Sequence, residues 1–122
     1  MYNCYIRIDC DNVGDKIEFA LYNNDPNTAQ LISDSIKDGI KWMIKEISGM
    51  INGEVLLIGS DDILYATQDN FLDLTKLENL RIDFFKRTNI TLSIGIGNSI
   101  ENALINIKIA KISGKNKIVH KR

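Results

Sequence analysis

The chain has 122 residues, with 15 basic residues against 16 acidic ones and a formal net charge of −1. A chain of this length forms one domain, 1–122, and buries roughly two thirds of its unfolded surface, so neither a disulfide nor a structural metal is needed for folding. The balanced charge argues against a general nucleic-acid binder, which needs a basic surplus to neutralise phosphates. We therefore expect no stable nucleic-acid binding.

Residues 3–9 alternate between apolar and polar side chains, which predicts a strand with one buried face. Cys4 and Cys10 share that face and lie too far apart along one straight strand to bond to each other. We expect both to be core thiols in a reducing compartment. The start of the chain leads directly into this strand, and no apolar run approaches the roughly 18–20 residues that cross a bilayer. The expected location is the cytoplasm, without membrane insertion.

Helical signals follow. Asp11-Asn12-Val13-Gly14 ends the first strand, and a short helical turn is expected after it. Asp25 is placed to cap a second helix in which Pro26 occupies the first turn. Apolar residues then recur at three- and four-residue steps to about Asn52-Gly53, which favours one long helix.

Two apolar runs, 54–58 and 63–67, flank Gly59-Ser60-Asp61-Asp62, which predicts a tight β-hairpin with acidic residues at its tip. A helix over 70–87 and an alternating strand over 90–97 are expected next.

The last helix is predicted to begin at a Ser99 cap and to end near Ser113, before Gly114 and a short strand over 117–119. The resulting order is a βαββαβ core plus a C-terminal αβ unit. That order predicts an α+β, ferredoxin-like palm: an antiparallel sheet with helices on one face.

Four aspartates fall where neighbouring strands end. Asp9 and Asp11 end the first strand, Asp61 and Asp62 lie in the hairpin turn, and the predicted topology brings the two pairs to one edge of the sheet. Two unit charges about 4 Å apart repel by roughly 4 kcal/mol at an effective dielectric of about 20, and a bound cation removes this penalty. The cluster therefore favours Mg²⁺ or Mn²⁺, with two ions able to activate a ribose hydroxyl and to stabilise leaving pyrophosphate. Asp is also a common turn residue, so either pair alone is compatible with a turn that holds no metal.

Small residues are a second indication of a binding site, after the aspartates. Ser93, Gly95 and Gly97 are expected on the side of their strand that the helices do not cover, where glycine marks either close approach of a ligand or a crowded sheet corner. Asn12 and Gly14 lie in the turn between the first strand and a helix, where backbone N–H groups can cradle phosphate.

Two lysines are a third indication of a binding site. Lys111 continues the row of Ile100, Leu104 and Ile107 that we expect to be buried, so its side chain should snorkel or reach into a cleft. With Lys115 it could hold a triphosphate tail. The alternative is a helix end whose cations merely complement the helix dipole.

Four of these segments, in this order, resemble the palm domains of GGDEF-type cyclases and type III CRISPR polymerases. They are Ile8-Asp9-Cys10-Asp11-Asn12-Val13-Gly14, Gly59-Ser60-Asp61-Asp62, Ile94-Gly95-Ile96-Gly97 and Ala110-Lys111-Ile112-Ser113-Gly114-Lys115-Asn116. The short chain and the aspartate-rich hairpin are most similar to the minimal CRISPR polymerase family (mCpol). The resemblance implies synthesis of cyclic di-adenylate, or a related cyclic oligonucleotide, from ATP in bacterial anti-phage defence. It also implies a separate effector that reads the nucleotide.

The resemblance also assigns roles by position. The implied metal ligands are Asp9, Asp61 and the Cys10 backbone carbonyl. The carboxylates implied to complete or support the site are Asp11 and Asp62. Lys111 and Lys115 match phosphate-binding positions. Ser60 departs from the commoner two-glycine turn and narrows the space for a nucleotide.

Three alternatives remain. A diguanylate-cyclase-like synthase would use GTP, although the guanine-reading residues of those enzymes have no clear match here. A non-catalytic nucleotide-binding palm would keep the fold without the chemistry. An RNA-binding module could use Tyr5 and Tyr65, but the acidic cluster fits RNA poorly. A cyclic product needs two nucleotides placed head to tail, and one small palm offers one site, so we expect a homodimer.

Overall fold

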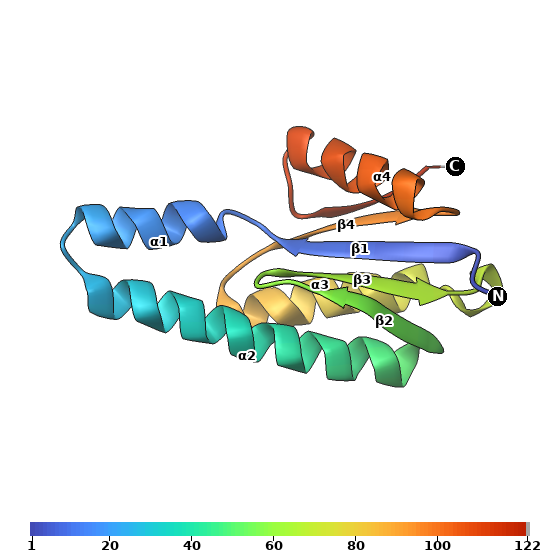
Figure 1. The fold of residues 1–122 in the computed structure, drawn as a ribbon, viewed down its shortest axis with the longest axis horizontal. Helices are drawn as coiled ribbons and strands as arrows, with labels where there is room; N and C mark the ends of the chain where they lie inside the picture. Colours follow the sequence, from blue (N-terminus) through green and yellow to red (C-terminus); the bar gives the residue numbers. More distant parts are fainter. Residues whose placement is uncertain (122) are drawn as a thin grey trace.

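The computed structural model describes residues 1–121, which form an α+β fold around a five-stranded sheet of order β2-β3-β1-β4-β5 (Figure 1). The central strand β1 (Cys4–Cys10) pairs antiparallel with β3 (Asp62–Thr67) and β4 (Leu92–Gly97). At the two edges, β2 (Gly53–Ile58) pairs antiparallel with β3, and β5 (Lys117–His120) pairs parallel with β4. The predicted α+β palm is confirmed. The sheet is mixed rather than wholly antiparallel, because a helical crossover returns the chain to β5 in the direction of β4.

Helices cover both faces of the sheet. α2 (Pro26–Met50) and α3 (Leu74–Thr88) lie on one face, and α4 (Ile100–Ile112) lies on the other, over β4 (Figure 1). α1 (Val13–Tyr22) packs along the first part of α2, beyond the end of the sheet, and is a full helix rather than the predicted short turn. The expectation that all helices share one face is therefore wrong. Within residues 1–121, no helix is both long and apolar enough to cross a membrane.

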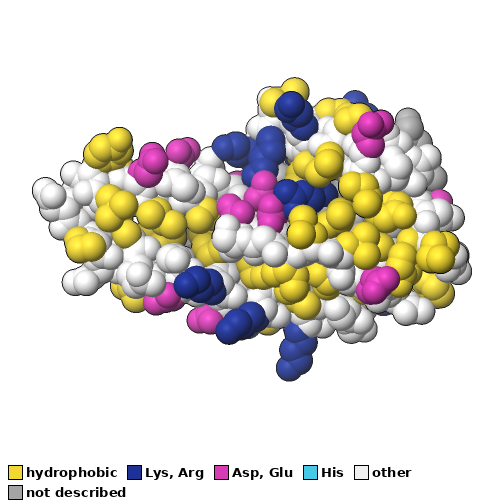
Figure 2. Space-filling model, in the orientation of Figure 1, with side chains coloured by type: hydrophobic (Ala, Val, Ile, Leu, Met, Phe, Trp, Pro, Cys, Tyr) yellow, Lys and Arg dark blue, Asp and Glu magenta, His cyan; other side chains and the backbone are white. Residues whose placement is uncertain are grey.

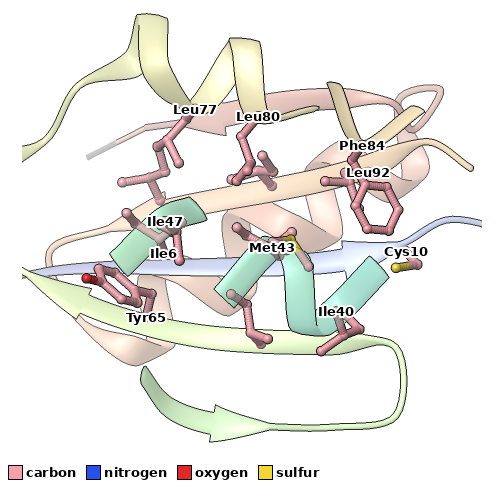
Figure 3. Packing of buried hydrophobic residues seen from close by; sticks show 14 of the residues in the cluster. Ile6, Cys10, Ile40, Met43, Ile47, Tyr65, Leu77, Leu80, Phe84 and Leu92 are labelled. Carbon is pink, nitrogen blue, oxygen red and sulfur yellow. The ribbon is translucent and has the colours of Figure 1, made fainter. Parts of the chain in front are cut away.

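The hydrophobic core fills the space between the sheet and the helices α2 and α3. Figure 3 shows side chains of the sheet, of α2 and of α3 meeting there. The labelled residues are Ile6, Cys10, Ile40, Met43, Ile47, Tyr65, Leu77, Leu80, Phe84 and Leu92. Both cysteines of β1 are buried on this side, as predicted. Each large apolar side chain buried here stabilises the folded state by about 1.5–3 kcal/mol. This stabilisation determines the register of β1 and which of its side chains face the core.

Two predicted helix caps are confirmed. The Asp25 carboxylate accepts a hydrogen bond from the Thr28 N–H at 3.1 Å, and the Ser99 hydroxyl accepts one from the Asn102 N–H at 3.1 Å. The helix expected over 70–87 begins later, at Leu74, because a 3₁₀ turn (Asp69–Phe71) precedes it. Its cap is Asp73, which accepts a hydrogen bond from the Lys76 N–H at 3.1 Å.

The buried row of α4 differs from the prediction. Ile100 and Leu104 are 42% and 46% exposed, and only Ile107 of the expected row is buried. The residues that face the sheet are Ala103, Asn106, Ile107 and Ala110. Small alanines let the helix backbone approach β4 closely, and the larger apolar residues point outward.

Candidate metal and nucleotide site

Three carboxylates meet where β1 ends. Asp9 lies opposite Asp62 across the β1–β3 pairing, and Asp61 precedes β3 in the hairpin turn. The Asp61 carbonyl accepts a hydrogen bond from the Cys10 N–H at 2.9 Å, which ties the turn to β1. One oxygen from each carboxylate lies within 4.8 Å of the others. Acidic side chains gather near the middle of the face in Figure 2, with basic side chains beside them.

Two cations partly neutralise this acidic cluster of Asp9, Asp61 and Asp62. The Arg7 guanidinium donates to Asp62 Oδ2 at 2.7 Å, and Lys111 Nζ lies 3.6 Å from Asp9 Oδ2. Burial raises the pKa of Asp9, Lys111 opposes the rise, and the neighbouring carboxylates add to it. A proton or a metal ion is therefore more favourable at Asp9 than at an exposed carboxylate. The sequence analysis missed Arg7, since an arginine at an outward strand position is ordinarily just solvated.

The hairpin turn requires glycine at one position. The Gly59 N–H donates to the Asp62 carbonyl at 2.9 Å, and a Cβ on Gly59 would lie 1.8 Å from Asp62 Oδ1. Glycine thus leaves room for the Asp62 carboxylate. Ser60 is exposed at the tip of the turn, and its effect on nucleotide space stays a prediction.

Asp11 lies apart from the acidic cluster and is 1% exposed. Its carboxylate accepts hydrogen bonds from Thr91 Oγ1, Ser93 Oγ and Lys111 Nζ, each at 2.7 Å, and from the Asn116 N–H at 3.1 Å. Burial alone would raise the pKa of Asp11, but the hydrogen bonds from Lys111, Thr91 and Ser93 outweigh it, so the pKa lies below its usual value. With both oxygens engaged, Asp11 is placed to orient Lys111.

The glycine-rich strand β4 is covered by α4, so the expectation of an open face at Ser93, Gly95 and Gly97 is wrong. All three residues are buried. A Cβ on Gly95 would lie 2.2 Å from the Ile107 nitrogen and 2.4 Å from the Ala103 oxygen. Glycine at 95 therefore permits close helix packing and leaves no room for a nucleotide there, and Ser93 supports Asp11 instead of facing a ligand.

The predicted phosphate-binding residues lie beside the acidic cluster. Lys111 Nζ also approaches the Cys10 carbonyl at 3.3 Å, and Lys115 Nζ donates to Asn12 Oδ1. Asn12 precedes α1 in a left-handed conformation with φ of 61°, and no described side chain caps the N–H groups of that helix. Nothing lies within 4 Å of a Cβ built on Gly14 in the first turn. Open N–H groups at a helix N-terminus attract anions.

A hollow that the sequence analysis did not predict lies between α1 and α2. Its lining begins at Asp15 and Lys16 in the first turns of α1 and continues along the facing sides of both helices. The remaining lining residues are Phe19, Ala20, Asn23, Asp25, Thr28 and Ile32.

Comparison with known proteins agrees with this geometry. Residues 5–121 match the mCpol family, described as the minimal CRISPR polymerase domain. Among solved structures, the chain is similar to a Csm1–Csm4 cassette in complex with one ATP, with 19% identity over 94% of this chain and a TM-score of 0.70. It is also similar to the active GGEEF domain of a diguanylate cyclase from Vibrio cholerae, with 13% identity over 98% of this chain and 82% of that one, and a TM-score of 0.59.

The coverage of these relatives differs. The chain spans 20% of the matched chain in the Csm1–Csm4 cassette. No curated protein matches the sequence. At these identities the structural likeness shows the palm fold, whereas the family match extends over nearly the whole chain. The chain belongs to the minimal CRISPR polymerase (mCpol) family.

Proposed function

We propose that this protein is a metal-dependent nucleotidyltransferase that makes a cyclic di- or oligonucleotide from ATP, as a signal in bacterial anti-phage defence. The observation that carries the proposal is the convergence of Asp9, Asp61 and Asp62 within 4.8 Å, beside Lys111. Lys115 follows in the next turn, where its ammonium group donates to Asn12. Membership of the mCpol family supports the chemistry and its context.

The donor set fits Mg²⁺ or Mn²⁺. The three carboxylates and the Cys10 carbonyl are hard oxygen ligands of the kind these ions prefer. The Cys10 side chain is buried in the hydrophobic core, so only the carbonyl of this residue is available as a ligand. When bound, one or two such ions would activate an attacking ribose hydroxyl and neutralise the leaving pyrophosphate.

The residues of the chain would bind and orient the substrate. Lys115, Asn12 and the uncapped N–H groups at the start of α1 would hold the triphosphate, with Gly14 allowing close approach. Lys111, in the last turn of α4, would contribute a second ammonium group. Catalysis of this kind depends on positioning and on charge stabilisation prepared before the reaction.

The hollow between α1 and α2 would receive the base. Its volume of about 560 Å³ and its largely apolar lining suit a planar ring system. The Csm1–Csm4 cassettes described with ATP and with pppApA support adenine. The likeness to a diguanylate cyclase makes GTP the alternative substrate.

A cyclic product implies that two nucleotide-loaded sites face each other, so the enzyme would act as a homodimer. A separate effector would read the product. Neither membrane insertion nor stable nucleic-acid binding is part of this proposal.

The test is to incubate the purified protein with each of the four NTPs and Mg²⁺ or Mn²⁺, beside an Asp61→Ala control, and to identify products by mass spectrometry. A cyclic adenylate made only by the wild type would support the proposal, and a cyclic guanylate would support the alternative. If neither metal allows turnover of any NTP while ATP still binds, the protein is a non-catalytic nucleotide-binding palm.

A further inference from the structure

The turn after α4 has an unusual backbone. Three consecutive residues have positive φ angles: Gly114 at 116°, Lys115 at 62° and Asn116 at 52°. A left-handed conformation costs a residue with a side chain roughly 1–2 kcal/mol, and only glycine and, less readily, asparagine adopt it routinely. Such strain persists only where surrounding contacts hold it, and it concentrates at functional sites. The 114–116 turn must therefore be fixed by its neighbours.

One set of contacts comes from the candidate site itself. The Asn116 N–H donates to Asp11 Oδ2 at 3.1 Å, and the Lys115 N–H donates to the Ala110 carbonyl at 2.9 Å. The Lys115 side chain reaches Asn12. These contacts bind two N–H groups and one ammonium group, and they leave the Asn116 carbonyl to another partner.

That partner is Arg81, which comes from α3 on the other face of the sheet. Its Nη1 donates to the Asn116 carbonyl at 3.4 Å and to the Asn116 side-chain Oδ1. Its Nη2 pairs with Glu78, one turn earlier on α3. The Arg81 side chain is 16% exposed, and its Nε is buried without a hydrogen-bond partner among residues 1–121. A buried N–H without an acceptor costs about 1–3 kcal/mol, so the other contacts of this guanidinium must outweigh that cost.

We propose that Arg81 is a positioning residue: it holds the strained 114–116 turn and thereby fixes the Lys115 ammonium group beside Asn12 and the start of α1. One guanidinium nitrogen, Nη1, donates to both oxygens of Asn116, while the Asp11 carboxylate accepts the N–H of the same residue. The inference rests on the proposed function for its consequence, which is triphosphate binding by Lys115. Its structural part, the clamp on the turn, can be tested without any nucleotide.

The first experiment measures amide hydrogen exchange by NMR in the nucleotide-free protein. Arg81→Gln should speed exchange at Asn116 about tenfold or more, since it removes charge-assisted hydrogen bonds that hold the turn closed. Glu78→Gln is the matched control: it removes the negative charge of the other partner of Arg81, leaves the contacts to Asn116, and should exchange as the wild type does. Arg81→Lys keeps the charge but has one nitrogen in place of the two that contact Asn116 and Glu78, and should fall between them.

Unchanged exchange at Asn116 in Arg81→Gln, or an equal rise in Glu78→Gln, would overturn the clamp. Thermal unfolding of the same samples checks that each variant is folded. If Arg81→Gln does not fold, Arg81→Lys takes its place as the test variant.

The second experiment measures the affinity for a non-reacting α,β-methylene analogue of ATP by calorimetry with Mg²⁺. Arg81→Gln should weaken binding about tenfold in the wild-type background and have no further effect in a Lys115→Gln background, because contacts that act in series are not additive. Additive effects would overturn the role of Arg81 in positioning Lys115. A wild type that binds no analogue would contradict the proposed function instead, and the exchange data would still decide whether Arg81 holds the turn.

Discussion

Replacing Lys111 by methionine should strengthen the binding of Mn²⁺ to the nucleotide-free protein. Lys111 Nζ lies 3.6 Å from Asp9 Oδ2 and 3.3 Å from the Cys10 carbonyl, two of the oxygens that we propose as metal ligands. The ammonium group thus occupies space that a divalent cation would use. When a nucleotide is bound, its triphosphate offers this ammonium group another partner.

The size of the effect can be bounded. A single charge and a double charge about 4 Å apart repel by roughly 8 kcal/mol at an effective dielectric of about 20, which is an upper limit. A lysine side chain can swing away from the arriving metal ion and recover most of this energy. We therefore expect a gain of about 1–3 kcal/mol, which is roughly a tenfold to hundredfold lower dissociation constant for Mn²⁺.

The assay is a titration of the free protein with Mn²⁺, followed by electron paramagnetic resonance, with Lys115→Met as the matched control. Lys115 carries the same charge, but its ammonium group contacts Asn12, so its loss should change the affinity about threefold or less. Equal effects of the two substitutions would mean that general electrostatics, and not occupancy of the site, sets the affinity. Weaker binding by Lys111→Met would refute the reasoning outright.

Four further predictions concern single residues. Asp61→Ala should abolish product formation, and Mg²⁺ should no longer raise the melting temperature, which differential scanning calorimetry would detect; an unchanged rise would place the metal elsewhere. Gly95→Ala should lower the free energy of unfolding in urea by about 3 kcal/mol, because the new Cβ would collide with the α4 backbone. Gly14→Ala, with open space around it, should be neutral or stabilise by up to about 1 kcal/mol, and a large loss there would contradict this account. Asp11→Asn should destabilise the protein at neutral pH by about 2–4 kcal/mol. Since the folded state lowers the pKa of Asp11, this difference should be constant above the unfolded-state value of about 3.9 and shrink as the pH falls below it.

The sequence was sufficient to predict that Asp9, Asp61 and Asp62 meet, although it also placed Asp11 among them, and the structure does not. Asp9 ends a strand whose partners follow from the element order, and Asp61 and Asp62 occupy a turn between two apolar runs. Strand alternation then decides which side chains share a face. Once β1 is central and pairs with β3, the meeting of these carboxylates follows from topology alone.

The sequence was not sufficient to place α4. Its outer positions Ile100 and Leu104 are apolar, and its buried Asn106 is polar, so hydrophobic periodicity indicated the wrong row. Asn106 is buried because its side-chain amide donates to the Ile96 carbonyl at 2.6 Å and the Lys121 carbonyl at 2.7 Å. Satisfied hydrogen bonds of this kind appear only once the strands on either side are in place.

The two arginines eluded the sequence analysis for a related reason. Arg7 and Arg81 act through partners that lie 55 and 35 residues away along the chain, and neither belongs to a motif. Arg7 and Lys111 together show how the charge of the site is balanced. When Asp9, Asp11, Asp61 and Asp62 are all ionised, Arg7 and Lys111 neutralise half of their negative charge. One divalent cation would neutralise the other half. Removing Lys111 leaves a larger negative charge at the site, so the protein should then bind its metal tightly even when no nucleotide is bound. On this argument Lys111 makes metal binding and nucleotide binding depend on each other, while Arg7 holds Asp62 in place throughout.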